Sequence, residues 1–315
     1  MARIDRHPHV KDYIVEMDLG AVVARGGVAD LFEAGNLILL SGYRLPIDYE
    51  TFETLDKRID AIEDKDTRRK IKKLTTNLFL TGKAPEQRSA FDRTGPALIF
   101  ADPVRQAIFD ILCKGDPDIF ERARRALKIA QDEMQRIFGI CFPSYQPFRF
   151  IPSVRLTQTL FENLHWDNHS IDADFHQARL FGNLDARPRI WHVSHHSDDY
   201  MRQIYEEFDL GRFAGKDPNL MLEYIHADLL GGTINTWMEH LPKHKIAFEP
   251  GEVWSGESRL ISHQIFYGEA AMVFMWFMHV SDMVNPQNRF NERVAAVHRE
   301  MAARKPSAAG HEARK

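Results

Sequence analysis

Two short stretches of the sequence carry side chains that could bind one metal ion together. His165 and Asp167 lie two residues apart, and residues i and i+2 of an extended strand point to the same side. A third histidine, His263, lies about a hundred residues downstream in an apolar stretch typical of a strand. Two imidazoles and one carboxylate on one face suit a divalent transition metal with open positions opposite. The sequence therefore predicts His165, Asp167 and His263 as metal ligands and catalytic residues.

Other histidines offer alternatives, because the chain has 15 of them and a His-x-Asp pair also arises by chance. His240 and His244 have the spacing of two ligands on one helix face, but Pro242 between them argues against a helix. His195 and His196 precede an expected helix start, where surface positions are common. We therefore expect His263 as the distal ligand and keep His240 and His244 as replacements.

The composition places limits on the class of protein. Hydrophobic residues make up 44% of the 315 positions and charged residues 27%, which is ordinary for a soluble globular enzyme. The formal net charge is -4, so the chain lacks the excess of basic residues that is typical of a nucleic-acid binder. Two cysteines favour a reducing compartment. The N-terminus lacks the pattern of a secretory signal, and the apolar runs are too short to span a bilayer. We expect a cytoplasmic protein with no integral membrane segment.

The predicted metal ligands need a scaffold, and its first part reads as helical. Over residues of about 46–140, aspartates precede helix-like runs, two of them as Asp-Pro pairs, and a carboxylate cap with proline in the first turn favours a helix start. The expected helices cover Asp48 to Glu63, Asp102 to Gly115, and Asp116 to about Phe138, the last ending at Gly139. Their apolar stripes indicate packing against one side of a sheet.

The second part, about 148–280, reads as short strands separated by turns, which is typical of a β-barrel or jelly roll. The predicted strands are 149–151, 153–157, 177–181, 189–193, 245–248, 259–266 and 271–278, with a helix from Asp198 to about Phe208. A C-terminal helix over about 288–303 and a flexible tail, 305–315, complete the chain. We predict one domain over 1–304, mainly β with buttressing helices.

The order of these motifs resembles a known superfamily. His-x-Asp, then the Pro250-Gly251 turn, then a strand histidine resembles the double-stranded β-helix (jelly roll, cupin-like) of Fe(II)/2-oxoglutarate oxygenases. The resemblance implies Fe(II), 2-oxoglutarate as cosubstrate, and O₂. Related halogenases lack the carboxylate, so the presence of Asp167 favours hydroxylation. Many members carry an arginine just after the distal histidine, whereas this chain has Glu269 to Val273 there.

A narrower resemblance is to bacterial Kdo hydroxylases. They share His165-Trp166-Asp167, an R-x-F-x-N-[IL] strand that matches Arg179 to Leu184, and a P-R-x-W segment that matches Pro188 to Trp191. Leu31 to Gly35 also looks like their N-terminal part, so the resemblance covers about residues 30–280.

This resemblance implies that Arg179 binds the distal carboxylate of 2-oxoglutarate, which suits the planar fork of a guanidinium. Arg259 competes for that role, because it lies four residues before the distal histidine and would face the same side of a regular strand. Arg155 and Arg189 are candidates for substrate carboxylates, and Asn168 could contact substrate or stabilise its loop.

The sequence thus predicts a non-haem Fe(II)/2-oxoglutarate-dependent dioxygenase that hydroxylates, or otherwise oxidises, a small polar molecule such as a sugar acid or amino acid. The alternative is a β-barrel that binds a metal or small ligand without oxidative chemistry. A homo-oligomer is compatible with either.

Overall fold

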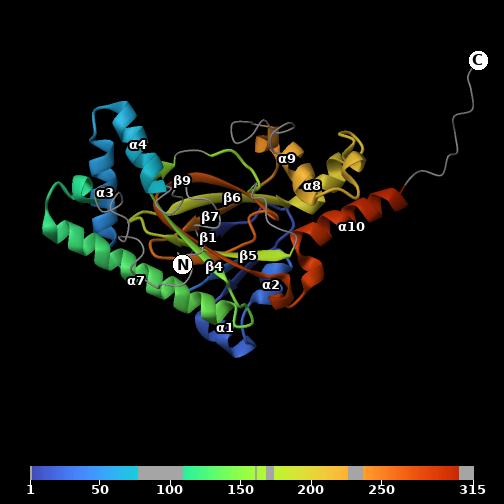
Figure 1. The fold of residues 1–315 in the computed structure, drawn as a ribbon, viewed down its shortest axis with the longest axis horizontal. Coiled ribbons are helices and arrows are strands. Elements are labelled where there is room, and N and C mark those ends of the chain that lie inside the picture. Colours follow the sequence, from blue (N-terminus) through green and yellow to red (C-terminus); the bar gives the residue numbers. More distant parts are fainter. Residues whose placement is uncertain (1, 77–108, 160–161, 168–173, 226–236, 305–315) are drawn as a thin grey trace, which may run out of the picture.

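One long strand, β9 (Ile261–His279), runs through both sheets of the molecule. Figure 1 shows the resulting curled arrangement of strands. The computed structural model describes residues 2–76, 109–159, 162–167, 174–225 and 237–304. Within these ranges the other strands are β1 (Arg3–Asp5), β2 (Ile14–Met17), β3 (Leu37–Leu40), β4 (Arg149–Thr159), β5 (Phe175–Asn183), β6 (Arg189–His196), β7 (His244–Phe248) and β8 (Val253–Ser255).

The two halves of β9 pair with different strands. The first half pairs with β6, which is followed by β7 and β1. The second half lies between β4 and β5, and β5 is followed by β8, β3 and β2. A strand shared in this way folds the sheet over on itself, which is the double-stranded β-helix. The predicted fold class, mainly β with helices, is confirmed.

Alternation along β9 separates a hollow interior from a helix-covered exterior. His263, Ile265, Val273 and Met275 line a cavity between the sheets. Phe274 and Trp276, which alternate with the last of these residues, instead join the large core on the other side of the sheet. Side chains of a strand point alternately to its two faces, so one strand can build both the site and the core.

Helices cover the outer face of the larger sheet and the end of the smaller one. The helices described over their whole length are α1 (Leu19–Arg25), α2 (Ala29–Glu33), α3 (Tyr49–Asp60), α4 (Lys65–Thr76), α7 (Pro117–Cys141), α8 (Ser197–Ile204), α9 (Pro218–Glu223) and α10 (Phe290–Ala303), and residues 109–113 are also helical. Short 3₁₀ turns span Leu210–Phe213, Trp237–His240, Val280–Asp282 and Pro286–Asn288. None of the helices in the described ranges is long and apolar enough to cross a membrane.

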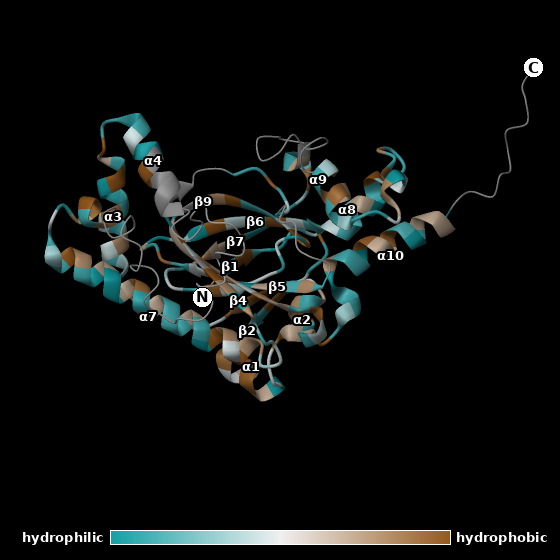
Figure 2. Ribbon diagram, in the orientation of Figure 1, coloured by the Kyte–Doolittle hydropathy of each residue, from teal (hydrophilic) through white to brown (hydrophobic). Residues whose placement is uncertain are grey.

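The longest helix, α7, supports the sheet. Asp116 caps it by accepting hydrogen bonds from the backbone N–H groups of Asp118 and Ile119. Figure 2 shows apolar and polar residues alternating along it. Its buried face includes Phe138, whose ring stacks on that of Trp276 with the ring centres 4.2 Å apart. The helix was expected to stop at Gly139, but it continues to Cys141, because Gly139 remains helical here and packing outweighs its low helix propensity.

Other predicted boundaries also change. The helix expected from Asp198 to about Phe208 is α8, which begins at Ser197 and ends at Ile204. The strands expected over 259–266 and 271–278 form one strand that begins only at Ile261. The turn expected at Gly268 is therefore absent from this described segment. The beginning of the helix predicted from Asp102 and the predicted tail 305–315 lie outside the described residues.

Candidate metal centre

His165 and His263 are neighbours across a backbone bridge. The N–H of His165 donates to the carbonyl of His263 at 3.0 Å, and the N–H of His263 donates back at 2.8 Å. Residues paired in this way carry their side chains on the same side of the sheet, and the two ring centres lie 4.6 Å apart. Local pairing therefore brings together two histidines that are far apart in the sequence.

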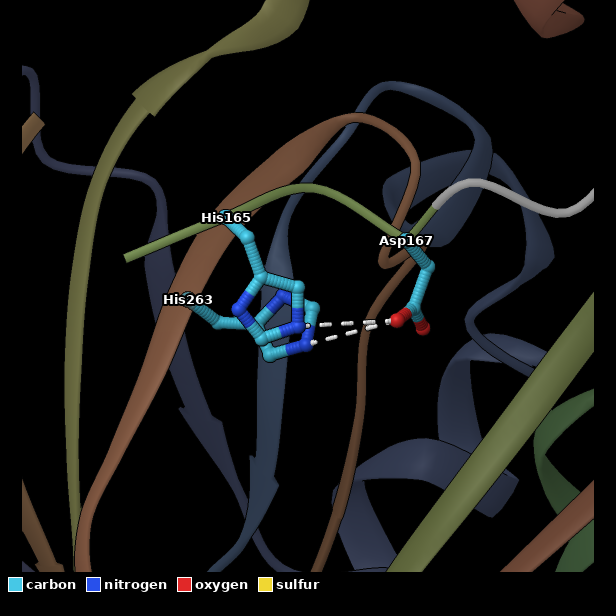
Figure 3. A group of neighbouring side chains, drawn as sticks. All are labelled: His165, Asp167 and His263. Carbon is cyan, nitrogen blue, oxygen red and sulfur yellow. Dashed lines mark ion pairs between the residues drawn. The ribbon is translucent and has the colours of Figure 1, made fainter. Parts of the chain in front are cut away.

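Asp167 completes the group. Its backbone N–H donates to the carbonyl of Ser258 at 3.0 Å, which fixes the segment that carries it. One carboxylate oxygen, Oδ1, lies 3.8 Å from Nε2 of His165 and 3.9 Å from Nε2 of His263. Figure 3 shows the three side chains converging. The distances are too long for hydrogen bonds, and they leave room for one ion between the three atoms.

Both imidazoles are oriented by their other nitrogen. Nδ1 of His165 lies 2.7 Å from the carbonyl oxygen of Asn163, and Nδ1 of His263 lies 3.1 Å from that of Ile261. A carbonyl only accepts, so each Nδ1 carries the hydrogen and each Nε2 keeps its lone pair. Burial, together with the neighbouring His165, lowers the pKa of His263 to about 4. His263 is therefore neutral at physiological pH, the form that binds metals.

A cavity of about 160 Å³ opens beside these three residues, with room for a small organic molecule. Much of its wall is apolar, and Trp191 stacks on the ring of His263 with the ring centres 5.3 Å apart. Among the described residues, its charged lining apart from the metal-ligand candidates consists of Arg155, Glu162, Arg179 and Arg189. An apolar pocket with a few convergent polar groups is typical of a small-molecule site.

Arg179 lies at the metal end of the cavity. It comes from β5 and is 5% exposed. Its Nη1 donates to Oδ2 of Asp167, the carboxylate oxygen that does not face the two histidines. The structure thus places Arg179 against a candidate metal ligand.

Arg189 lies at the start of β6 and is 2% exposed. It crosses the backbone at Gly268, and its Nη1 has no hydrogen-bond partner among the described residues. Burial and the positive charge of Arg155 lower its pKa to about 9, which still leaves it charged at neutral pH. A buried, charged donor without a partner is costly, so this guanidinium is suited to an anionic ligand.

Arg155 is more exposed and forms a 4.0 Å ion pair with Glu162. Three of the arginines singled out in the sequence, Arg155, Arg179 and Arg189, therefore line the same cavity. Glu162 was not singled out, although its position three residues before His165 was a usable signal.

Arg259 lies outside this group. It precedes β9 in a turn, so the strand alternation expected for it does not apply. Its Nε pairs with Glu257 at 3.4 Å, and its guanidinium lies 4.9 Å from the ring centre of Phe290. Asn168 lies outside the described residues.

Of the alternative histidines, His240 is exposed at the end of the 3₁₀ turn Trp237–His240, and His244 is engaged elsewhere. Nδ1 of His244 accepts from the N–H of His7 at 3.0 Å, and its Nε2 faces the carbonyl of Lys11. A second group, His196 with Asp198 and Asp199, also has potential ligand atoms close together. There Asp198 is paired with Arg293 at 3.1 Å and with Arg202 at 3.5 Å, which disfavours a cation.

Neither a protein-family model nor a curated protein matches this sequence. Solved structures do. Kdo hydroxylase KdoO, a non-haem Fe(II) α-ketoglutarate-dependent dioxygenase solved with α-ketoglutarate and Fe(III), aligns with a TM-score of 0.54 and 14% identity over 90% of this chain and 95% of that one. This chain has the fold of that dioxygenase. The complexes of KdoO with cobalt(II) and with succinate and Fe(III) align with TM-scores of 0.52 and 14% identity, over 96% of this chain and 100% of theirs.

Proposed function

We propose that the protein is an Fe(II)/2-oxoglutarate-dependent dioxygenase that hydroxylates, or otherwise oxidises, a small polar molecule. The observation that carries the proposal is the convergence of Nε2 of His165, Nε2 of His263 and Oδ1 of Asp167 at the wall of a cavity. KdoO, which shares the fold, was solved with Fe(III) and α-ketoglutarate, a synonym of 2-oxoglutarate.

The donor set fits the iron. Two neutral imidazoles and one carboxylate are the ligands of non-haem Fe(II) oxygenases, and histidines that donate Nδ1–H to a carbonyl are fixed for binding through Nε2. When bound, the iron and 2-oxoglutarate would supply the oxidising chemistry, with succinate and CO₂ as coproducts. The protein holds the reactants in place and keeps the site apolar.

Arg189 is the residue we propose for the distal carboxylate of 2-oxoglutarate. It is buried in the cavity, and one of its donors has no partner among the described residues. Arg179 and Arg259, the candidates suggested by the sequence, each already contact a carboxylate of the protein, Asp167 and Glu257 respectively. A buried guanidinium that still has a free donor is better suited to pair with an incoming carboxylate.

Arg155 and Glu162 are proposed to contact the substrate. They are the more exposed of the charged lining residues, with side-chain exposures of 34% and 25%. A cation and an anion side by side can bind the carboxylate and the hydroxyl or amino groups of one molecule, as a sugar acid or amino acid would require. We propose the cytosol as the compartment, which the two free, buried cysteines support.

Anaerobic titration tests the proposal. Fe(II) and 2-oxoglutarate added together should give a weak visible charge-transfer band that disappears in His263→Ala, and with O₂ the protein should release succinate in the presence of its substrate. If the protein binds Fe(II) through the three residues but gives neither the band nor succinate, the alternative of a non-oxidative metal- or ligand-binding barrel is correct.

A further inference from the structure

The carboxylate of Asp167 divides its two oxygens between different partners. Oδ1 faces the Nε2 atoms of His165 and His263, at 3.8 and 3.9 Å. Oδ2 accepts from Nη1 of Arg179. The guanidinium of Arg179 thus occupies the side of the carboxylate from which Oδ2 could also contact an ion.

The guanidinium of Arg179 is itself held in place. Its backbone carbonyl accepts from the hydroxyl of Ser255 at 2.7 Å, which ties β5 to β8 at this position. Gln177 lies two residues earlier on the same face of β5, and its amide oxygen, oriented toward Arg179, accepts from Nε and Nη2, the latter at 2.9 Å. The carboxylate of Glu257 is buried nearby. Burial by itself raises the pKa of Glu257, but the positive charges around it, that of Arg179 among them, lower this pKa below its usual value. Arg179 therefore sits between fixed acceptors.

We infer that Arg179 is a positioning residue, which holds Asp167 so that it offers a single oxygen to the metal; this inference rests on the proposed function. A carboxylate that bound through both oxygens would occupy the position that would otherwise be left for O₂ beside a bound 2-oxoglutarate. The partners of a ligand fix its orientation and tune its binding. Arg179 contributes to metal binding through Asp167 and not by touching the cosubstrate.

Two effects of the positive charge oppose each other. A guanidinium near the site repels a dication, which weakens metal binding. The pairing, however, already holds the carboxylate of Asp167 in one rotamer, so metal binding no longer costs that side-chain entropy. Residues that orient a metal ligand typically contribute 10- to 100-fold to affinity. We therefore expect orientation to dominate.

Cobalt(II) binding to the metal-free protein, measured by calorimetry without 2-oxoglutarate, tests this role. Arg179→Met should weaken Co(II) binding about 10- to 100-fold and alter the visible Co(II) spectrum. At saturating Co(II), its affinity for 2-oxoglutarate should stay near the wild-type value. The matched control, Arg189→Met, removes another buried cavity arginine. It should bind Co(II) with near-wild-type affinity and 2-oxoglutarate more weakly. Arg179→Lys keeps the positive charge but lacks the planar guanidinium with its several donors, so it should recover part of the lost Co(II) affinity.

The outcomes separate the two proposals. Unchanged or tighter Co(II) binding by Arg179→Met would mean that Arg179 only neutralises Asp167 and would overturn the positioning role. Loss of 2-oxoglutarate binding at saturating Co(II) would overturn it too, and would make Arg179 a cosubstrate residue. If Arg179→Met does not fold, Arg179→Lys carries the same comparison with a smaller expected loss. Wild-type protein that fails to bind Co(II) through His165 and His263 would instead refute the proposed function.

Discussion

The side chain of Arg189 lies across the backbone at Gly268. A Cβ added at that glycine would lie 2.7 Å from Cγ and 2.9 Å from Cζ of Arg189, closer than non-bonded carbon atoms approach. Because Gly268 has no side chain, the side chain of Arg189 can pass over the backbone there and reach the cavity. This contact explains why a glycine stands in the middle of a strand, where it otherwise weakens the strand.

Gly268→Ala should displace Arg189. Overpacking at this contact should lower the free energy of unfolding by about 1–3 kcal/mol, and affinity for 2-oxoglutarate should fall on the order of tenfold. Co(II) binding should persist. Gly139→Ala is the control, because a Cβ there meets no heavy atom within 4 Å. Calorimetric titration of both variants checks the prediction, and wild-type 2-oxoglutarate affinity in Gly268→Ala would contradict it.

Arg189→Ala should raise the Michaelis constant for 2-oxoglutarate more than Arg259→Ala does. Loss of a charge-assisted two-point contact in a buried site costs on the order of 2–4 kcal/mol, or roughly thirty- to a thousandfold in affinity. Arg259 pairs with Glu257 outside the cavity, so its loss should act mainly on stability. Steady-state kinetics with varied 2-oxoglutarate decide between them, and the reverse ranking would move the role to Arg259.

Replacement of His165, Asp167 or His263 by alanine should abolish Fe(II)-dependent turnover while the fold remains. Each supplies one of the three converging atoms, and loss of one leaves an incomplete ligand set. Circular dichroism checks the fold, and Fe(II) titration checks binding. A fully active His263→Ala would require another distal ligand. His244 would be a poor replacement, because both its ring nitrogens face backbone groups of the N-terminal segment.

His176 should make the protein less stable in mild acid. Its burial lowers the pKa in the folded state to about 4, with Glu257 opposing and Arg259 reinforcing the shift. In the unfolded chain this histidine has an ordinary pKa of about 6.5. Between pH 4 and pH 6.5 it is therefore protonated in the unfolded chain but not in the folded one. The stabilisation is complete above pH 6.5 and is lost as the pH falls toward 4, by roughly 3 kcal/mol.

Urea unfolding between pH 4 and pH 7 measures this effect. His176→Gln should give a shallower rise of the unfolding free energy with pH than the wild type, because one titrating group is removed. An unchanged slope would assign the pH dependence to other groups. Tyr145 and Phe32 pack around His176, so a lower stability at pH 7 is also expected.

The sequence by itself determined the local features of this protein. The capped start of α7 at Asp116 follows from short-range hydrogen bonding. The two-residue spacing of His165 and Asp167 suffices to predict a shared site, and the succession of short strands suffices for a β-barrel or jelly roll. These features depend on neighbours a few residues away, so the sequence contains the information directly.

Only the tertiary structure decided how distant parts meet. The pairing of His165 with His263 depends on strand register, which a pattern of residue types does not specify across a hundred positions. The division of the arginines, with Arg179 against Asp167, Arg189 in the cavity and Arg259 against Glu257, depends on which face each side chain takes. Arginine is chemically the same at all three positions, so burial and partners determine what each one can bind.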